Sequence, residues 1–86
     1  MLNDVINEIE VLVEAGNLSV LQILWEEYYE KGLNYEYMFQ HVYIHAAVMK
    51  QYAICEWMET IYETFDPVTQ IAMAQTRAYV HFLLRQ

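Results

Sequence analysis

One short pattern recurs along the chain and limits what the chain can fold into. In residues 12–24, apolar residues lead into Gly16, and paired apolar positions follow it. Gly16 suits the left-handed conformation in which many helices end. A comparable pattern returns in residues 46–58, about 34 residues later, and more weakly in residues 72–84. A recurrence at this period is typical of stacked helical hairpins. We therefore expect one domain of about three helix–turn–helix units, at residues 3–34, 35–65 and 66–86.

Start and stop signals predict an all-α fold of roughly six helices. Asn3 or Asp4 can cap the first helix, and the glycine-containing stretch Lys31–Asn34 is the clearest break. Asp66 followed by Pro67 is a strong helix start. We expect the helices at about residues 5–14, 18–31, 35–49, 52–64, 68–75 and 78–84. No alternating run predicts a strand.

The C-terminal end of the chain is unusually apolar for the last unit of a stack. Hydrophobic residues make up 57% of the 86 residues, against roughly 45–50% in an average domain. Stacked repeats need polar end caps to be stable alone, whereas Tyr79–Leu84 is apolar on most sides. We expect this end to be covered by a protein partner, which is either a second copy or a different chain.

The charge balance excludes two classes of partner. Twelve acidic residues stand against four scattered basic ones, for a net charge of -8. Phosphates and anionic lipids are bound by clustered Lys and Arg, so we expect neither direct nucleic-acid binding nor membrane binding. Residues 1–14 carry four acidic residues and no basic start, so we expect no signal peptide. The longest uncharged run is too short to cross a bilayer, and Cys55 is the single cysteine. We expect an intracellular, cytoplasmic protein, or one assembled within a virion or host cell.

No group of residues indicates an enzyme, a cofactor or a metal. His41 and His45 share a helical face, but no third ligand accompanies them, and partly buried helix histidines explain the pair. Cys55 stands close to Glu56 and Glu59, a setting that disfavours a reactive thiolate. Pairs of glutamates at helical spacing are ordinary on solvated faces. We expect a non-enzymatic protein without cofactors.

Tyrosines give the better functional clue, because tyrosine is favoured in protein interfaces. Many of the eight tyrosines can equally fill a core. Those around the second glycine cannot all point inward, and acidic residues lie among them. The candidate protein-binding residues are Tyr28, Tyr29, Glu30, Tyr35, Glu36 and Tyr37.

Residues 15–24 resemble the turn and second helix of an ankyrin repeat, and Ala46-Ala47 resembles the small pair that ends its first helix. The likeness is to the divergent ankyrin-like repeats of large DNA viruses. The usual Thr-Pro-Leu-His opening is absent, Lys50 replaces a turn glycine, and the linkers lack the motif of the β-hairpin fingers. The resemblance implies a stacked scaffold that binds protein. The alternative is an unrelated six-helix bundle.

Three functional hypotheses follow from these features. The first is an ankyrin-like protein–protein interaction module with an acidic, tyrosine-rich surface. The second is a small structural subunit of a larger assembly, such as a minor capsid component of a virus. The third is an acidic inhibitor that imitates nucleic acid and occupies a basic groove.

Overall fold

Five helices make up the part of the chain that the computed structural model describes, which is residues 2–32 and 34–86, with side chains from residue 4 onward. The helices are α1 (Leu2–Ala15), α2 (Leu18–Glu30), α3 (Tyr35–Val48), α4 (Tyr52–Thr64) and α5 (Pro67–Leu84). No strand occurs among these residues. Leu33, part of the expected break at 31–34, lies outside the described residues. The all-α prediction is confirmed.

Local signals explain where three of the helices begin. The Asn17 side chain accepts a hydrogen bond from the Val20 backbone N–H at the start of α2. Asn34 caps α3, and Asp66 caps α5 by accepting from the Thr69 N–H at 2.7 Å. Such caps satisfy backbone donors that the first helical turn leaves unpaired. The expected cap at Asn3 or Asp4 is wrong, because α1 already includes Leu2.

The turns that join α1 to α2 and α3 to α4 have the same hydrogen-bond pattern. Gly16 N–H donates to Val13 and Asn17 N–H to Leu12, while 34 positions later Lys50 N–H donates to Ala47 and Gln51 N–H to Ala46. Gly16 has φ +68° and Lys50 has φ +58°. Both turns therefore end a helix with a left-handed residue, although only the first has a glycine there.

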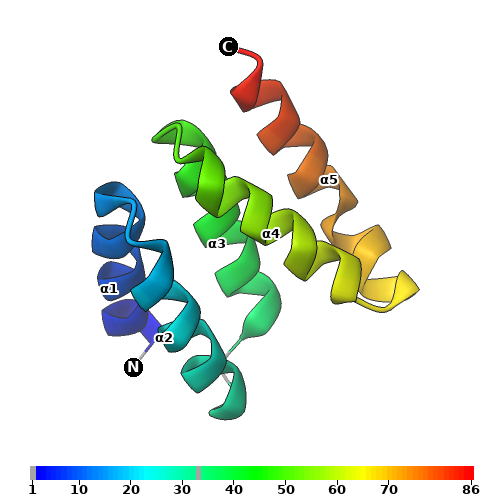
Figure 1. Ribbon diagram of the computed structural model, residues 1–86. Helices are drawn as coiled ribbons and strands as arrows, with labels where there is room; N and C mark the ends of the chain where they lie inside the picture. The colour runs from blue at the N-terminus through cyan, green and yellow to red at the C-terminus, as the bar shows by residue number, and fades with distance from the viewer. Residues whose placement is uncertain (1, 33) are drawn as a thin grey trace.

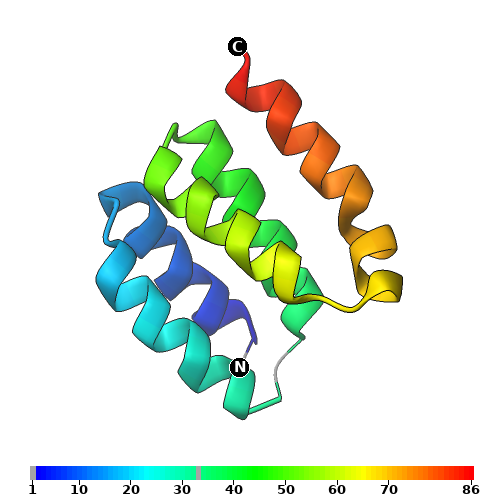
Figure 2. The ribbon, with the colours of Figure 1, turned by 45° about the vertical axis from the view of Figure 1, so that its right-hand side comes forward.

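The helices lie in two layers (Figure 1). α1, α3 and α5 lie side by side, with α3 in the middle in contact with both neighbours. α2 packs on α1, and α4 packs on α3, which leaves α5 without a helix of its own in the second layer (Figure 2). α5 lies at one edge of the molecule with its outer side uncovered.

The core runs between the layers and centres on α3. Its largest fully buried side chains come from all five helices, and Tyr43 and Phe39 of α3 are the largest of them. None of the described buried residues is charged. None of the described helices combines the length and hydropathy that a bilayer crossing requires.

The expected sixth helix does not exist as a separate element. α5 runs without interruption from Pro67 to Leu84, so the turn expected between residues 75 and 78 is absent. Gln75, Thr76 and Arg77 include neither glycine nor proline, and nothing in them opposes continuation of a helix. The third segment of the recurring pattern, residues 72–84, is therefore not a hairpin.

Candidate functional site

A hollow of about 460 Å³ opens between α2 and α4. α2, α4 and the first residue of α3 supply its walls. We call it the aromatic groove, and its lining residues are Gln22, Trp25, Glu26, Tyr29, Tyr35, Trp57 and Ile61.

Four aromatic rings form the groove, and they are inclined to one another. The Trp25 ring meets the Trp57 ring at 76° with 5.5 Å between centroids, and it meets the Tyr35 ring at 60° and 5.1 Å. The Tyr29 ring meets the Tyr35 ring at 65° and 4.8 Å. Edge-to-face pairs of this kind are favourable. They also leave ring faces turned in different directions around one hollow.

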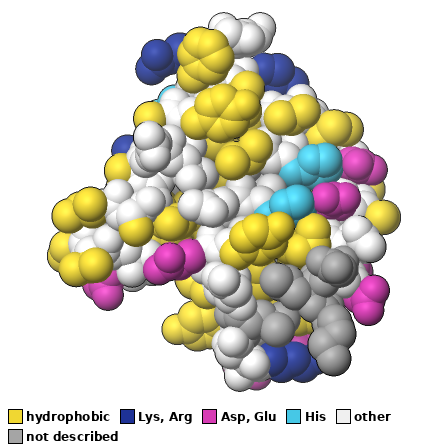
Figure 3. Space-filling model, turned by 180° about the vertical axis from the view of Figure 1, so that it is seen from behind, with side chains coloured by type: hydrophobic (Ala, Val, Ile, Leu, Met, Phe, Trp, Pro, Cys, Tyr) yellow, Lys and Arg dark blue, Asp and Glu magenta, His cyan; other side chains and the backbone are white. Residues whose placement is uncertain are grey.

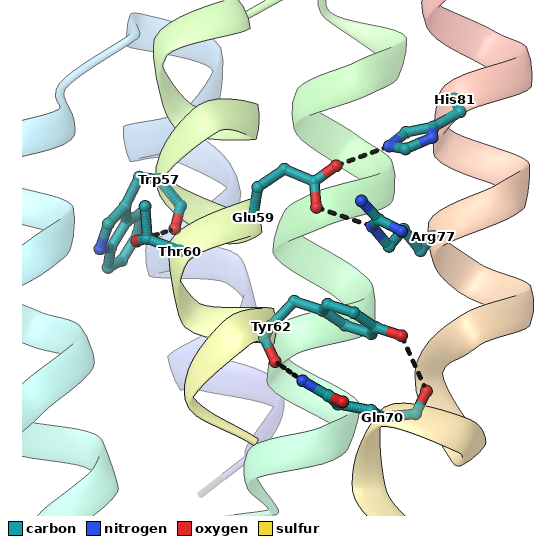
Figure 4. Close-up of polar contacts among 7 residues, drawn as sticks. All are labelled: Trp57, Glu59, Thr60, Tyr62, Gln70, Arg77 and His81. Carbon is teal, nitrogen blue, oxygen red and sulfur yellow. Dashed lines mark hydrogen bonds and ion pairs between the residues drawn. The ribbon is translucent and has the colours of Figure 1, made fainter. Parts of the chain in front are cut away.

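Burial divides these rings into a base and a rim. Trp25 is only 4% exposed, and its indole N–H donates a hydrogen bond of 3.1 Å to the Tyr35 hydroxyl. Trp57 and Tyr35 are half-buried, whereas Tyr29 is 61% exposed. Figure 4 shows the Trp57 ring on the side of α4 that faces α2, opposite to Glu59. Trp25 thus forms the base, and the other three rings remain reachable from solvent.

The groove is electrostatically acidic. Glu26 lines it and is exposed, and the lining residues include neither Lys nor Arg. Glu30 is exposed one helical turn further along α2. Burial raises the pKa of the Tyr35 hydroxyl, so this group stays neutral at physiological pH. The groove therefore offers ring faces and carboxylate, a combination that favours a cation.

The six candidate residues from the sequence are divided between different places. Tyr29 and Tyr35 line the groove. Tyr28 is only 7% exposed and donates a 2.7 Å hydrogen bond to Glu8 of α1, which raises the pKa of Tyr28 to about 12. Tyr28 therefore belongs to the α1–α2 contact. Glu30 is exposed beside the groove.

The remaining two candidates, Glu36 and Tyr37, are exposed at the start of α3, and Tyr37 lies away from the groove. The Tyr37 ring stacks on His41 with 6.1 Å between centroids, and both residues line a separate hollow of about 290 Å³. His41 Nε2 lies 2.8 Å from a Glu10 carboxylate oxygen, and the His side chains appear beside acidic ones on the face drawn in Figure 3. The candidate residues lie close together in the sequence, but they lie at different places in the fold.

His41 and His45 are half-buried, as the sequence analysis predicts, and carboxylates of α1 face them. His45 Nε2 lies 3.3 Å from a Glu14 carboxylate oxygen, and the two imidazoles stack at 6.2 Å. Among the described residues, no group of three or more His, Cys, Asp or Glu side chains has the arrangement of a metal site.

Glu59 joins α4 to α5 (Figure 4). Its carboxylate accepts a 2.8 Å hydrogen bond from Arg77 Nε and lies 2.6 Å from His81 Nε2. Burial acts to raise the pKa of Glu59, but these hydrogen bonds outweigh burial, so the pKa is lowered. Tyr62 and Gln70 add two reciprocal hydrogen bonds between the same elements. These contacts fix α5 against the hairpin that carries Trp57.

Cys55 is buried in α4 and has no features of a nucleophile. Burial, followed by the nearby negative charge of Glu59, raises the pKa of the Cys55 thiol to about 11. A thiol in this setting stays protonated at physiological pH, whereas nucleophilic cysteines have lowered pKa values.

Five groove residues were not among the binding residues expected from the sequence, namely Gln22, Trp25, Glu26, Trp57 and Ile61. Trp25 and Trp57 occupy apolar positions of helical periodicity, which are typical of core residues. The sequence carries no signal that separates them from core residues, because the 34-residue offset pairs Trp57 with Ile23, which is apolar as well.

Comparison with models of protein families, with curated proteins and with solved structures finds no match to this chain. Its function therefore has to be inferred from its own residues.

Proposed function

We propose that the protein is a non-enzymatic protein-binding module, and that the aromatic groove receives a Lys or Arg side chain from a basic segment of its partner. The observation that carries this proposal is the groove itself, where inclined, accessible rings and Glu26 line one hollow that has no basic residue. Of the tyrosines expected to form a binding surface, the proposed site includes only Tyr29 and Tyr35. It also includes the two tryptophans.

Each part of this groove stabilises a bound cation. A Lys or Arg head group over an aromatic face is stabilised by about 0.5–2 kcal/mol, and tryptophan is the best such face. A carboxylate at the rim adds an ion pair. The long stems of Lys and Arg also bury apolar area against the rings. Since the whole chain carries a net charge of -8, a basic segment is attracted before it makes contact.

The scaffold that we propose is a short ankyrin-like stack. The matching hydrogen bonds of the turns at Gly16 and Lys50 support the equivalence of the α1–α2 and α3–α4 hairpins. α5 lies beside α3 as α3 lies beside α1, so it corresponds to the first helix of a third repeat. No second helix of that repeat packs on α5 in the described part of the chain. In such a stack, the aromatic groove lies between the second helices of neighbouring units.

Binding of a basic peptide tests the proposal. The probe is a short fluorescent peptide rich in Lys and Arg, and a peptide with Gln at the same positions serves as its control. We expect binding of the basic peptide alone. We expect Tyr29→Ala and Glu26→Gln each to weaken it several-fold, because each removes one part of the cation site.

Two variants separate groove binding from diffuse attraction to an acidic protein. Tyr52→Ala removes a tyrosine of similar exposure (58% against 61%), and Glu36→Gln removes an exposed carboxylate outside the groove. We expect both to bind like the unchanged protein. Equal losses in all four variants, or no binding of the basic peptide, would overturn the proposal.

One observation favours the structural-subunit hypothesis as a second candidate. The outer side of α5 is apolar and uncovered, with Val68 and Ile71 each 77% exposed. In an assembly, neighbouring subunits would cover this face. Such a subunit should co-purify with a large particle, and its α5 should be protected from proteolysis in that particle.

A further inference from the structure

The outer face of α5 is an uncharged strip with a symmetric order of side chains. Its exposed residues are Val68, Ile71, Ala72, Gln75, Ala78, Tyr79 and Phe82. At 3.6 residues per turn these positions fall on one side of a helix. The strip runs along the edge of the molecule, and hydrophobic side chains gather at this edge in Figure 3. In a chain with a net charge of -8, so long a helical face without a carboxylate is unusual.

The strip is complementary to itself. Val68 and Phe82 each lie seven residues from Gln75, and Ile71 and Tyr79 each lie four residues from it. If two α5 helices pack antiparallel about a two-fold axis through Gln75, Val68 of one copy lies opposite Phe82 of the other. Ile71 likewise lies opposite Tyr79. Each opposed pair then joins an aliphatic side chain to an aromatic ring.

The centre of the strip permits a close approach of two helices. Ala72 and Ala78 each lie three residues from Gln75, so they lie opposite one another in the same arrangement. Small residues allow helix axes to come close together. The two Gln75 side chains meet on the axis, where each primary amide can donate to and accept from the other. A central polar pair of this kind fixes the register of a helix pair.

Charges at the two ends favour the antiparallel direction. Arg85 is exposed at the C-cap of α5, and Asp66 is exposed at its N-cap. An antiparallel pair brings Arg85 of each copy beside Asp66 of the other, and it also places opposite ends of the helix dipoles side by side. No like charges face each other along the strip.

We propose that the occupant of this face is a second copy of the chain, which forms a two-fold dimer through antiparallel α5 helices centred on Gln75. The contact length is about 27 Å for 18 residues at 1.5 Å each. A single helix pair of this length buries less than the roughly 800 Å² per partner of a standard interface. The dimer is therefore weak, with a dissociation constant in the micromolar range.

The two-fold axis gives the proposal a specific test. Gln75→Glu and Gln75→Lys each place two like charges opposite one another, so each variant alone should dimerise at least tenfold more weakly than the unchanged protein. An equimolar mixture of the two variants places opposite charges there and should recover association. Gln75 is exposed, so far-UV circular dichroism should show an unchanged fold.

Sedimentation equilibrium of the full chain, up to roughly 100 μM because a single helix pair is a weak contact, measures these dissociation constants. Asn7→Glu and Asn7→Lys make the same changes of net charge at an exposed position on α1 and should dimerise like the unchanged protein. The proposal would be overturned if the protein stayed monomeric at every concentration, or if only one of the two Gln75 variants dimerised more weakly. It would also be overturned if the mixture of the two variants did not recover dimerisation.

Discussion

Lys50 holds the α3–α4 turn in a conformation that glycine adopts more easily. Its φ is +58°, whereas the equivalent residue of the α1–α2 turn is Gly16 at +68°. A residue with a Cβ in this region is disfavoured by roughly 1–2 kcal/mol. The free energy of unfolding should therefore depend on whether position 50 carries a Cβ.

The Lys50 side chain also makes a contact of its own, so a direct change to glycine would mix two effects. Its ammonium donates a 2.7 Å hydrogen bond to the Leu83 carbonyl near the end of α5. This exposed hydrogen bond contributes about 0.5–1 kcal/mol. Lys50→Ala and Lys50→Gly both remove this hydrogen bond. Only Lys50→Gly also removes the Cβ that disfavours the left-handed backbone conformation. The comparison of these two variants isolates the backbone effect.

We expect Lys50→Gly to be more stable than Lys50→Ala by about 0.5–1 kcal/mol. This value is the left-handed penalty of roughly 1–2 kcal/mol less the roughly 0.5–1 kcal/mol of additional conformational entropy that glycine loses on folding. Since 1 kcal/mol shifts the Tm of a domain of this size by roughly 4–8 °C, the glycine variant should melt several degrees higher. Urea unfolding and thermal melts, both followed by circular dichroism, measure the difference.

The first turn provides the reverse experiment. Gly16→Ala should destabilise the protein by at least the roughly 0.5–1 kcal/mol that separates alanine from glycine at position 50, because it adds a Cβ at φ +68° that also lies only 3.0 Å from Gln51 Oε1. The Gln51 amide already donates to the Glu14 carbonyl at 3.1 Å, which restricts its movement. If Lys50→Ala proves at least as stable as Lys50→Gly, position 50 is not held left-handed and the equivalence of the two turns is wrong.

Two further predictions concern titratable groups of α4. Glu59→Gln should lower the free energy of unfolding by about 1–2 kcal/mol at neutral pH, because it weakens charged hydrogen bonds to Arg77 and His81. Since the folded protein lowers the pKa of Glu59 below its ordinary value of 4.5, Glu59 stabilises the fold above that pH, and this contribution disappears as the pH falls through the lowered value. Urea unfolding across acidic pH should show a smaller loss of stability for the variant, and parallel curves would contradict this. Cys55, whose pKa is raised to about 11, should resist a thiol reagent at neutral pH until the protein unfolds in urea, so rapid labelling of the native protein would refute its burial.

The sequence predicted helix boundaries well where a single residue decides them. The caps at Asn34 and Asp66 and the left-handed Gly16 act on their own backbone neighbours, so their effect is visible in the sequence. The prediction of a turn near residues 75–78 rested only on likeness to the earlier turns. No local breaker supports it, and the helix continues.

The aromatic groove was less predictable, because it depends on how α2 and α4 lie relative to each other. Trp25 and Trp57 are 32 residues apart, and each reads as a core residue of its own helix. Their rings meet only because the two hairpins pack side by side. Tyr37 was grouped with Tyr35 as a near neighbour in sequence, yet a helix places positions two apart on different sides.

The environment of the two tryptophan indoles tests the proposed cation site most directly. The measurement is a ¹H–¹⁵N spectrum of the two indole N–H groups, with Trp57→Phe to assign them, during titration with the basic peptide. We predict that the Trp57 signal moves and saturates as the peptide binds, and that Glu26→Gln weakens this response while Glu36→Gln does not. A peptide that binds while both indole signals stay fixed would contradict the cation site in the groove.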